Sequence, residues 1–238
     1  MTQTSNAPTI RLRDVHGFYG ESHVLHGVNF DVCEGEVVTI AGRNGAGKTT
    51  TLRAIMGNLT RTRGEISFGA HDLRAAKRKN IPRLGIGYVP EDRGIFASLT
   101  VKENLLLPRV VASGGMSMDR IHDLFPNLKG RDGTQGTRLS GGEQQMLAIA
   151  RILRTGARTI LLDEPTEGLA PVIIEQIGLV LRALREDGFT ILLVEQNFRF
   201  AQSISDRFLV MEEGQIVDAF EADEIRRNPA QLEAYLGV

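Results

Sequence analysis

The residues from Gly42 to Thr49 have the types and spacing of a phosphate-binding loop. They match the pattern Gly-x-x-x-x-Gly-Lys-Ser/Thr. A β-branched run precedes them and a helical pattern follows, so backbone N–H groups and the helix start would face negative charge. Lys48 is expected to meet the β and γ phosphates, and Thr49 to ligate magnesium. The predicted phosphate site consists of Gly42, Arg43, Asn44, Gly45, Ala46, Gly47, Lys48, Thr49 and Thr50.

An acidic pair, Asp163 and Glu164, follows the buried-strand pattern from Arg158 to Leu162. In a phosphate site of this kind, Asp163 would hold the magnesium shell. Glu164 comes one residue later, where its carboxylate can polarise the water that attacks the γ-phosphate. Alternatively, this Asp-Glu-Pro segment could cap a helix that begins at Pro165. The phosphate loop favours the first interpretation.

A second candidate anion site lies in the segment Leu139 to Gln145, which reads Leu-Ser-Gly-Gly-Glu-Gln-Gln. Ser140 can cap a helix that starts near Gly141. Small residues at Gly141 and Gly142 leave backbone N–H groups open to an anion. The segment therefore predicts a second phosphate-binding helix start.

Composition narrows the class of protein. The chain has 238 residues, of which 42% are hydrophobic and 24% charged, with a formal net charge of -1, as in ordinary globular proteins. This balance argues against binding of nucleic acid through bulk positive charge, and the basic run Lys77-Arg78-Lys79 is interpreted as a solvated face. The longest apolar runs are only a few residues, whereas a membrane-spanning helix needs about 20. The polar stretch Met1 to Thr9 does not resemble a secretory signal.

Short apolar runs alternate with helical patterns along the chain. Strands are expected at Glu36 to Ala41, Thr159 to Leu162 and Thr190 to Val194, and helices at about 141 to 154 and 172 to 186. This alternation predicts an α/β fold with a mostly parallel, buried sheet. Between about residues 92 and 150 the strand signal fades. We interpret that segment as a helical subdomain inserted in a single domain of residues 1–238.

The C-terminal stretch from Glu221 to Val238 carries Leu232, Tyr235 and Leu236. These apolar residues fit a helix that folds back on the core. They fit a contact with a partner equally well, and the sequence does not separate these alternatives.

The phosphate loop, the Ser140 segment and the Asp163-Glu164 pair, in this order, resemble the ATP-binding cassette family from about Ile10 to Gly214. The resemblance implies a P-loop NTPase core with an antiparallel β subdomain and the inserted helical subdomain. It also implies ATP and Mg²⁺ as ligands. In that family, the segment matching Ser140, Gly141 and Gly142 contacts the γ-phosphate of ATP held by the other subunit of a head-to-tail pair. One chain would then be half of an ATPase.

Two more segments match the family by position. Tyr19, which precedes Gly20, matches the aromatic residue that stacks on adenine, although ordinary edge packing would explain it too. The segment from Thr166 to Pro171 matches the loop that meets the partner cassette. We therefore expect it at the dimer interface.

Two positions depart from the usual family pattern. Glu91 replaces the glutamine that commonly follows the Tyr-Val-Pro segment, and a carboxylate there could still ligate metal through water. Gln196 replaces the usual histidine after the last core strand. Glutamine can hydrogen-bond a γ-phosphate oxygen but does not become a cation near neutral pH. The resemblance makes Lys48, Glu164 and Gln196 the expected catalytic residues and Thr49, Glu91 and Asp163 the expected metal ligands.

The Tyr-Val-Pro-Glu, Glu-Gly-Leu-Ala-Pro and Val-Glu-Gln-Asn segments together resemble the ATP-binding subunits of branched-chain amino acid importers. Such subunits work with a second cassette, membrane permeases and, indirectly, an external solute-binding protein. The lack of a secretory signal predicts a cytoplasmic protein, the near-neutral charge predicts no nucleic-acid partner, and the resemblance implies a place at the inner face of the membrane. The alternatives are a urea or amide importer, a soluble cassette ATPase without a transport role, and a regulatory cassette with little catalysis.

Overall fold

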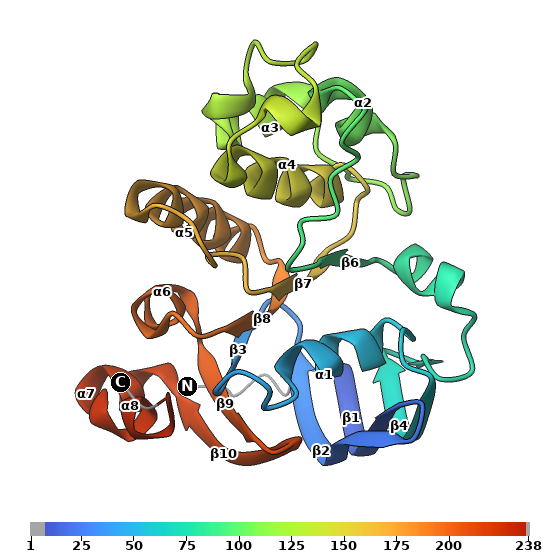
Figure 1. The fold of residues 1–238 in the computed structure, drawn as a ribbon, viewed down its shortest axis with the longest axis vertical. Helices are drawn as coiled ribbons and strands as arrows, with labels where there is room; N and C mark the ends of the chain where they lie inside the picture. The colour runs from blue at the N-terminus through green and yellow to red at the C-terminus, as the bar shows by residue number, and fades with distance from the viewer. Residues whose placement is uncertain (1–7, 237–238) are drawn as a thin grey trace.

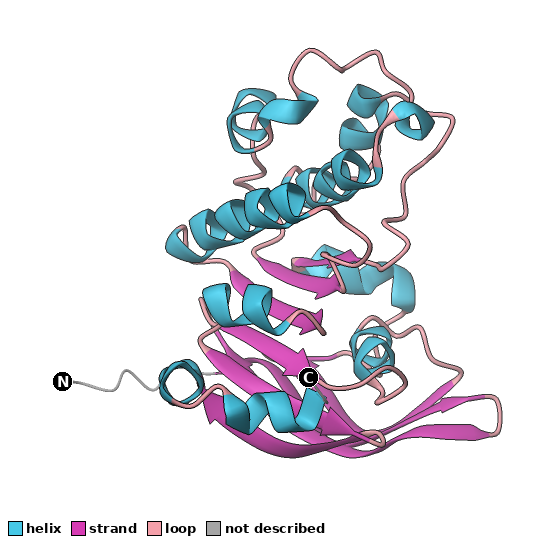
Figure 2. Ribbon diagram, turned by 60° about the vertical axis from the view of Figure 1, so that its left-hand side comes forward, coloured by secondary structure: helices cyan, strands magenta, loops and turns pink. Residues whose placement is uncertain are grey.

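The structure, a computed structural model, describes residues 8–236. Most of the Met1 to Thr9 stretch and the last two residues of the chain lie outside this range. The strands form two sheets, one four-stranded and one six-stranded. Figures 1 and 2 show the antiparallel strands β1, β2 and β4 near one end of the molecule and the helices α2 and α3 near the other.

The six-stranded sheet has the strand order β10-β9-β3-β8-β7-β6. Its strands are β3 (Val37–Ala41), β6 (Ile86–Val89), β7 (Thr159–Asp163), β8 (Thr190–Glu195), β9 (Arg207–Glu212) and β10 (Gln215–Glu221). All neighbours pair in parallel except β9 and β10. Every residue of β3, β7 and β8 is buried, which explains why these strands read as short apolar runs. The predicted mostly parallel sheet is confirmed.

The second sheet is antiparallel and has the order β2-β1-β4-β5. Its strands are β1 (Pro8–Tyr19), β2 (Ser22–Cys33), β4 (Arg61–Phe68) and β5 (His71–Asp72). Helix α1 (Lys48–Ile55) lies beside this sheet (Figure 1). Leu52 and Ile55 of α1 belong to one apolar cluster with Leu12 and Ile66 of this sheet and Ile40 of the other. The helix after the phosphate loop is thus anchored to both sheets.

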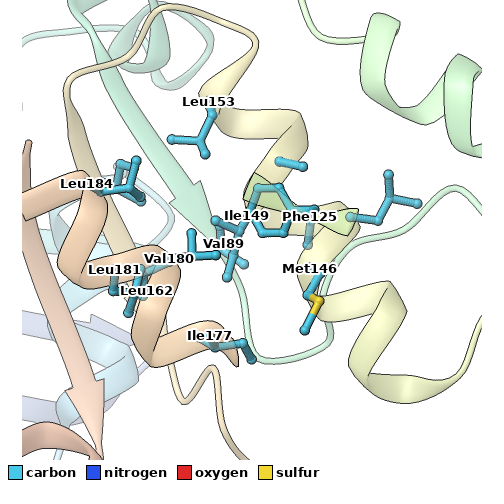
Figure 3. Packing of buried hydrophobic residues seen from close by; sticks show 14 of the residues in the cluster. Val89, Phe125, Met146, Ile149, Leu153, Leu162, Ile177, Val180, Leu181 and Leu184 are labelled. Atoms are coloured by element: carbon cyan, nitrogen blue, oxygen red, sulfur yellow. The ribbon is translucent and has the colours of Figure 1, made fainter. Parts of the chain in front are cut away.

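Helices cover the opposite face of the parallel sheet. Between β6 and β7 come α2 (Val101–Leu106), α3 (Met118–Leu124) and α4 (Gly141–Leu153), and after β7 comes α5 (Pro171–Glu186). Short 3₁₀ turns occur at Arg78–Leu84, Pro126–Leu128 and Gly136–Arg138. Figure 3 shows Phe125, Met146 and Ile149 beside Leu162 of β7 and Val180 of α5. Consecutive strand residues point to opposite faces, so Leu161 belongs to the α1 cluster and Leu162 to this one.

The C-terminal elements cover β9 and β10. They are α6 (Phe198–Ile204), α7 (Ala222–Arg227) and α8 (Ala230–Leu236). Leu232 and Ile225 are buried in a cluster with Phe208 of β9, so this tail folds back on the core, as the first alternative proposed. Within residues 8–236, no helix combines the length and the apolar character needed to cross a bilayer.

A pair of leucine substitutions tests the importance of the parallel sheet for stability. Leu162→Ala should lower the free energy of unfolding by about 2 to 5 kcal/mol, because it leaves a cavity at a position with 0% exposure. Leu179→Ala, at a position of α5 with 58% exposure, should change it by less than about 0.5 kcal/mol. Chemical denaturation of both variants would measure the difference. Equal losses would contradict this account of the core.

Candidate nucleotide site

The candidate site lies where four neighbouring strands end. In parallel strands the carboxyl ends meet at one edge of the sheet. Ala41 at the end of β3 pairs with Glu195 of β8, Asp163 of β7 pairs with Val194, and Val89 of β6 pairs with Leu162. The segments that follow β3, β6, β7 and β8 therefore begin side by side, although they are far apart in sequence.

The phosphate loop, residues 42–47, joins β3 to α1. A Cβ at Gly42 would clash with the carbonyl oxygen of Met211 in β9, so only glycine fits there. Arg43, Asn44 and Gly45 are exposed, which leaves their backbone accessible to a ligand. The turn after β9 holds the loop from outside, since the Gly214 N–H donates to the Ala46 carbonyl at 2.8 Å and the Gly214 carbonyl accepts from the His26 N–H at 2.8 Å.

Two predicted phosphate-site side chains on the first turn of α1 are buried next to the loop. Lys48 is only 4% exposed, and its ammonium donates to the carbonyls of Gly42 at 2.9 Å and Arg43 at 3.1 Å. Thr50 is buried and lines a cavity of about 420 Å³ together with Lys48 and Thr49. Glu91, Glu164 and Glu167 also line this cavity, so it has the polar lining that a phosphate and its counterion require.

The two predicted metal ligands Thr49 and Asp163 are directly bonded. The Thr49 hydroxyl donates to Asp163 Oδ1 at 2.8 Å, and the Tyr88 hydroxyl donates to Oδ2 at 2.8 Å. Burial raises the pKa of Asp163, as do the charges of Glu91 and Glu164, while both hydroxyl donors lower it. Burial likewise raises the pKa of Tyr88, which keeps its hydroxyl a donor.

Glu164 is held in a constrained position directly after β7. Its φ of 46° lies in the left-handed region, which is uncommon for residues other than glycine and often marks functional sites. Its carboxylate lies 3.4 Å from the Lys48 ammonium and accepts from the Gln196 amide at 2.7 Å. The same amide donates to Asn44 Oδ1 at 2.6 Å. Helix α5 begins at Pro171, so the alternative in which Asp163-Glu164 caps a helix at Pro165 is wrong.

Two of the predicted metal ligands, Thr49 and Asp163, offer oxygen atoms of the kind that a divalent cation binds, and within residues 8–236 no group of three or more His, Cys, Asp or Glu side chains is placed to hold a metal ion. Burial raises the pKa of Glu167, and the charges of Glu164 and Glu91 raise it further, which shows that these carboxylates repel one another. Carboxylate and hydroxyl oxygens are the ligands that Mg²⁺ prefers. The donor set of Thr49, Asp163 and Glu91 therefore suits magnesium, and a cation would relieve the repulsion.

Ser140 begins α4 as the sequence predicts. Its hydroxyl accepts from the Glu143 N–H at 3.3 Å, and the Glu143 carboxylate accepts from the Ser140 N–H at 2.8 Å, which is a complete capping box. Helix α4 lies with the helical elements on the far side of β7 and β8 from α1 (Figure 1). The structure thus brings Lys48, Asp163, Glu164 and Gln196 together at one sheet edge, whereas Ser140, Gly141 and Gly142 do not line the cavity of Lys48 and Glu164.

Tyr19 ends β1 and lies beside α1. Its hydroxyl accepts from the Arg53 guanidinium at 3.3 Å, and its side chain is partly exposed. Both interpretations of Tyr19 fit this position, so adenine stacking stays a prediction. Glu91 is exposed after β6 and lines the same cavity as Thr49.

Sequence reasoning assigned no role to two side chains at this edge. Tyr88 lies on β6, where it pairs with Leu161, and reaches the carboxylate of Asp163. Glu195 ends β8 and is buried. The sequence marks Glu195 as a charged residue directly after a fully apolar run. The role of Tyr88 could be recognised only from the register between β6 and β7.

Comparison with known proteins decides the family. The family model described as ABC transporter matches residues 25–167, more than half of the chain. The chain belongs to the ABC transporter family. It is 41% identical to the high-affinity branched-chain amino acid transport ATP-binding protein BraG of Pseudomonas aeruginosa, over 94% of this chain and 97% of that protein. It is 35% identical to the probable branched-chain amino acid transport ATP-binding protein LivF of Archaeoglobus fulgidus, over 91% and 93%.

Other ABC proteins are similar over nearly the same length. The lipopolysaccharide export system ATP-binding protein LptB of Acidithiobacillus ferridurans is 33% identical over 92% of each chain. A dimeric ATP-binding cassette in a post-hydrolysis state, bound to ADP and Pi, superimposes with a TM-score of 0.77 at 28% identity, over 90% of this chain and 98% of that one. The predicted family, fold class and ATPase class are confirmed, and this ABC chain is a nucleotide-binding subunit.

A tyrosine pair tests the role of Tyr88 toward the metal ligand. Tyr88→Phe removes the donor to Asp163 Oδ2 and should weaken Mn²⁺ binding about 10-fold in the presence of a non-hydrolysable ATP analogue. Electron paramagnetic resonance of free Mn²⁺ would measure this. Tyr235→Phe is the matched control, because it also removes a donor to a carboxylate, that of Asp218, away from the site. Equal affinities of the two variants would refute the role.

Proposed function

We propose that this chain is the ATP-hydrolysing subunit of an importer for branched-chain amino acids. The observation that carries the proposal is the convergence of Lys48, Thr49, Asp163, Glu164 and Gln196 at one sheet edge, with the helix start of α4 outside it. The choice of solute rests on the similarity to BraG and LivF over more than nine tenths of the chain. A cassette for urea or amides is the alternative solute class.

The separation of α4 from the phosphate loop supports a head-to-tail pair of cassettes. At this helix start Ser140 is exposed and Gly141 is partly exposed, whereas Gly142 is buried against Ile173. Ser140 and Gly141 can therefore serve a nucleotide held by a second cassette. That second cassette can be a copy of this chain or a related subunit. The loop from Thr166 to Pro171 connects Glu164 to α5 and would meet the second cassette. The helical subdomain, which we place at about residues 92–150, carries the Ser140 helix start.

The residues of this chain suggest how hydrolysis proceeds. Phosphate oxygens would take the N–H groups of the loop and the Lys48 ammonium, which now bonds carbonyls of Gly42 and Arg43. Loss of the Lys48 contact would free Glu164 to orient water and accept its proton. Mg²⁺, held by Thr49 and Asp163 with Glu91 through water, would neutralise developing charge on the phosphates. The Gln196 amide would keep its hydrogen bond to Glu164 and would also face the γ-phosphate.

The lack of a histidine at position 196 supports a site that does not depend on a titrating switch. Glutamine donates a hydrogen bond without adding charge near the phosphate. The Gln196 amide already bonds Glu164 and Asn44. An uncharged side chain can therefore position both groups. The competing view, a regulatory cassette with little catalysis, predicts that Glu164 contributes nothing to turnover.

The remaining parts of the transporter would come from other chains. We propose that membrane permeases bind this cassette at the inner face of the membrane and that an external solute-binding protein delivers the solute to them. ATP is the proposed nucleotide, and no nucleic-acid partner is proposed. A soluble cassette without permeases is the competing view, and a tagged chain recovered from solubilised membranes with only soluble partners would favour it.

Single-turnover hydrolysis tests the catalytic proposal. In the assembled complex, Glu164→Gln should slow ATP cleavage by about 100-fold or more, because the carboxylate that accepts the proton is lost. Glu175→Gln, an exposed glutamate of α5, is the matched control and should keep the rate of the native chain. Equal rates for Glu164→Gln and the native chain would remove the catalytic role of Glu164.

An uptake assay tests the solute. A strain lacking this gene should lose uptake of labelled leucine, and the gene carrying Glu164→Gln should not restore it. Labelled glutamate and urea are the comparisons. Loss of urea uptake with normal leucine uptake would favour the urea or amide alternative.

A further inference from the structure

Glu195 is a buried carboxylate without a part in the chemistry proposed above. It is the last residue of β8 and only 3% exposed. No ion pair to it occurs among residues 8–236, so a neighbouring cation does not explain its burial. Burying a charge without partners is costly, so the contacts of Glu195 indicate what it stabilises.

Four neutral donors surround the two carboxylate oxygens. Oε1 accepts from the Thr166 N–H at 3.1 Å and from the Thr166 hydroxyl at 2.6 Å. Oε2 accepts from the N–H groups of Gln196 and Asn197, each at 2.9 Å. Burial raises the pKa of Glu195, and these donors act in the opposite direction. Three of the four bonds come from backbone N–H groups, which can only donate, so the carboxylate oxygens act as acceptors toward both loops.

These bonds join the loop that follows Glu164 to the turn whose Gln196 side chain bonds the Glu164 carboxylate. Thr166 belongs to the loop between Glu164 and α5, and it is itself buried. Gln196 donates its side-chain amide to Glu164 and Asn44. Asn197 caps α6 by accepting from the Phe200 N–H at 3.2 Å. A single side chain thus ties together the loop proposed to meet the second cassette, the residue that holds Glu164, and the start of α6.

We propose that Glu195 is a positioning residue for ATP hydrolysis, which fixes the Gln196 turn to the Thr166 loop and thereby sets the Gln196 amide on Glu164. If a second cassette displaced the Thr166 loop on docking, the bonds of Glu195 would transmit that displacement to Gln196. The inference rests on the proposed catalytic roles of Glu164 and Gln196. It adds a side chain that touches neither nucleotide nor metal.

A glutamine cannot take the place of this carboxylate. Its amide group would face either the N–H of Thr166 or the two N–H groups of Gln196 and Asn197. The amide NH₂ of the glutamine would then face backbone N–H donors in a buried site, and the hydrogen bonds to one of the two loops would be lost. The substitution keeps the shape of the side chain, so it tests the bonds and not the volume.

Steady-state kinetics of the assembled complex test the proposal. Glu195→Gln should lower kcat about 10-fold, because a small displacement of Gln196 misorients the catalytic groups, while KM for ATP stays within about twofold. Asp206→Asn is the matched control, since Asp206 also links two segments, through the Val37 N–H at 2.9 Å and Arg185, but at the opposite end of β3. The control should keep the kcat of the native chain.

Thr166→Val is a milder second variant in case Glu195→Gln does not fold. It removes only the hydroxyl donor at 2.6 Å and should lower kcat about 3-fold, again with KM unchanged. A rise in KM with kcat unchanged, in either variant, would overturn the proposal. So would kcat values equal to that of the native chain in both variants.

A double-mutant cycle separates positioning from general destabilisation. In a Gln196→Ala background, Glu195→Gln should lower kcat by less than about twofold, because the group that it positions is already absent. A full 10-fold loss in that background would show that Glu195 acts by another route. If Glu164→Gln also retained the native rate, the proposed function itself would fail, whereas a slow Glu164→Gln with a normal Glu195→Gln would refute only this inference.

Discussion

The alignment of parallel strand ends is the constraint on which the site depends. Ala41, Asp163 and Glu195 close three adjacent strands whose residues are all buried. Because main-chain bonds fix the register between these strands, each of them delivers its next residues to one edge. The phosphate loop, Glu164 and Gln196 owe their proximity to that register. Side-chain contacts between them refine a geometry that the sheet has already set.

The polar side chains at this sheet edge form hydrogen bonds and an ion pair with one another. A bound nucleotide would replace some of these contacts. Lys48 bonds loop carbonyls and approaches Glu164, and Thr49 bonds Asp163. Buried polar groups need partners, so these pairs lower the cost of keeping a charged site in a folded chain. Nucleotide binding would exchange one set of hydrogen bonds for another. The net affinity therefore depends on differences between these two sets and not on their sum.

Sequence patterns predicted the parts of the site that are local. The phosphate loop, the cap at Ser140 and the strand that delivers Asp163 follow from residues within a few positions of each other. Strands β3, β7 and β8 were recognisable because strands buried on both faces read as apolar runs. The bond from Tyr88 to Asp163 was not predictable, since it depends on the register of β6 against β7. Likewise, two of the four bonds of Glu195 come from Thr166, which lies 29 residues earlier in the chain.

The turn after β9 has a consequence for where this protein can be divided. Gly214 holds Ala46 of the phosphate loop and His26 of the antiparallel sheet, and Met211 closes the space beside Gly42. These contacts come from a part of the chain beyond residue 167, where the match to the family model ends. The segment that matches the family model, residues 25–167, is therefore shorter than the part of the chain that shapes the phosphate loop. A fragment cut at the motif boundary would carry the loop sequence without the strand and turn that give the loop its form.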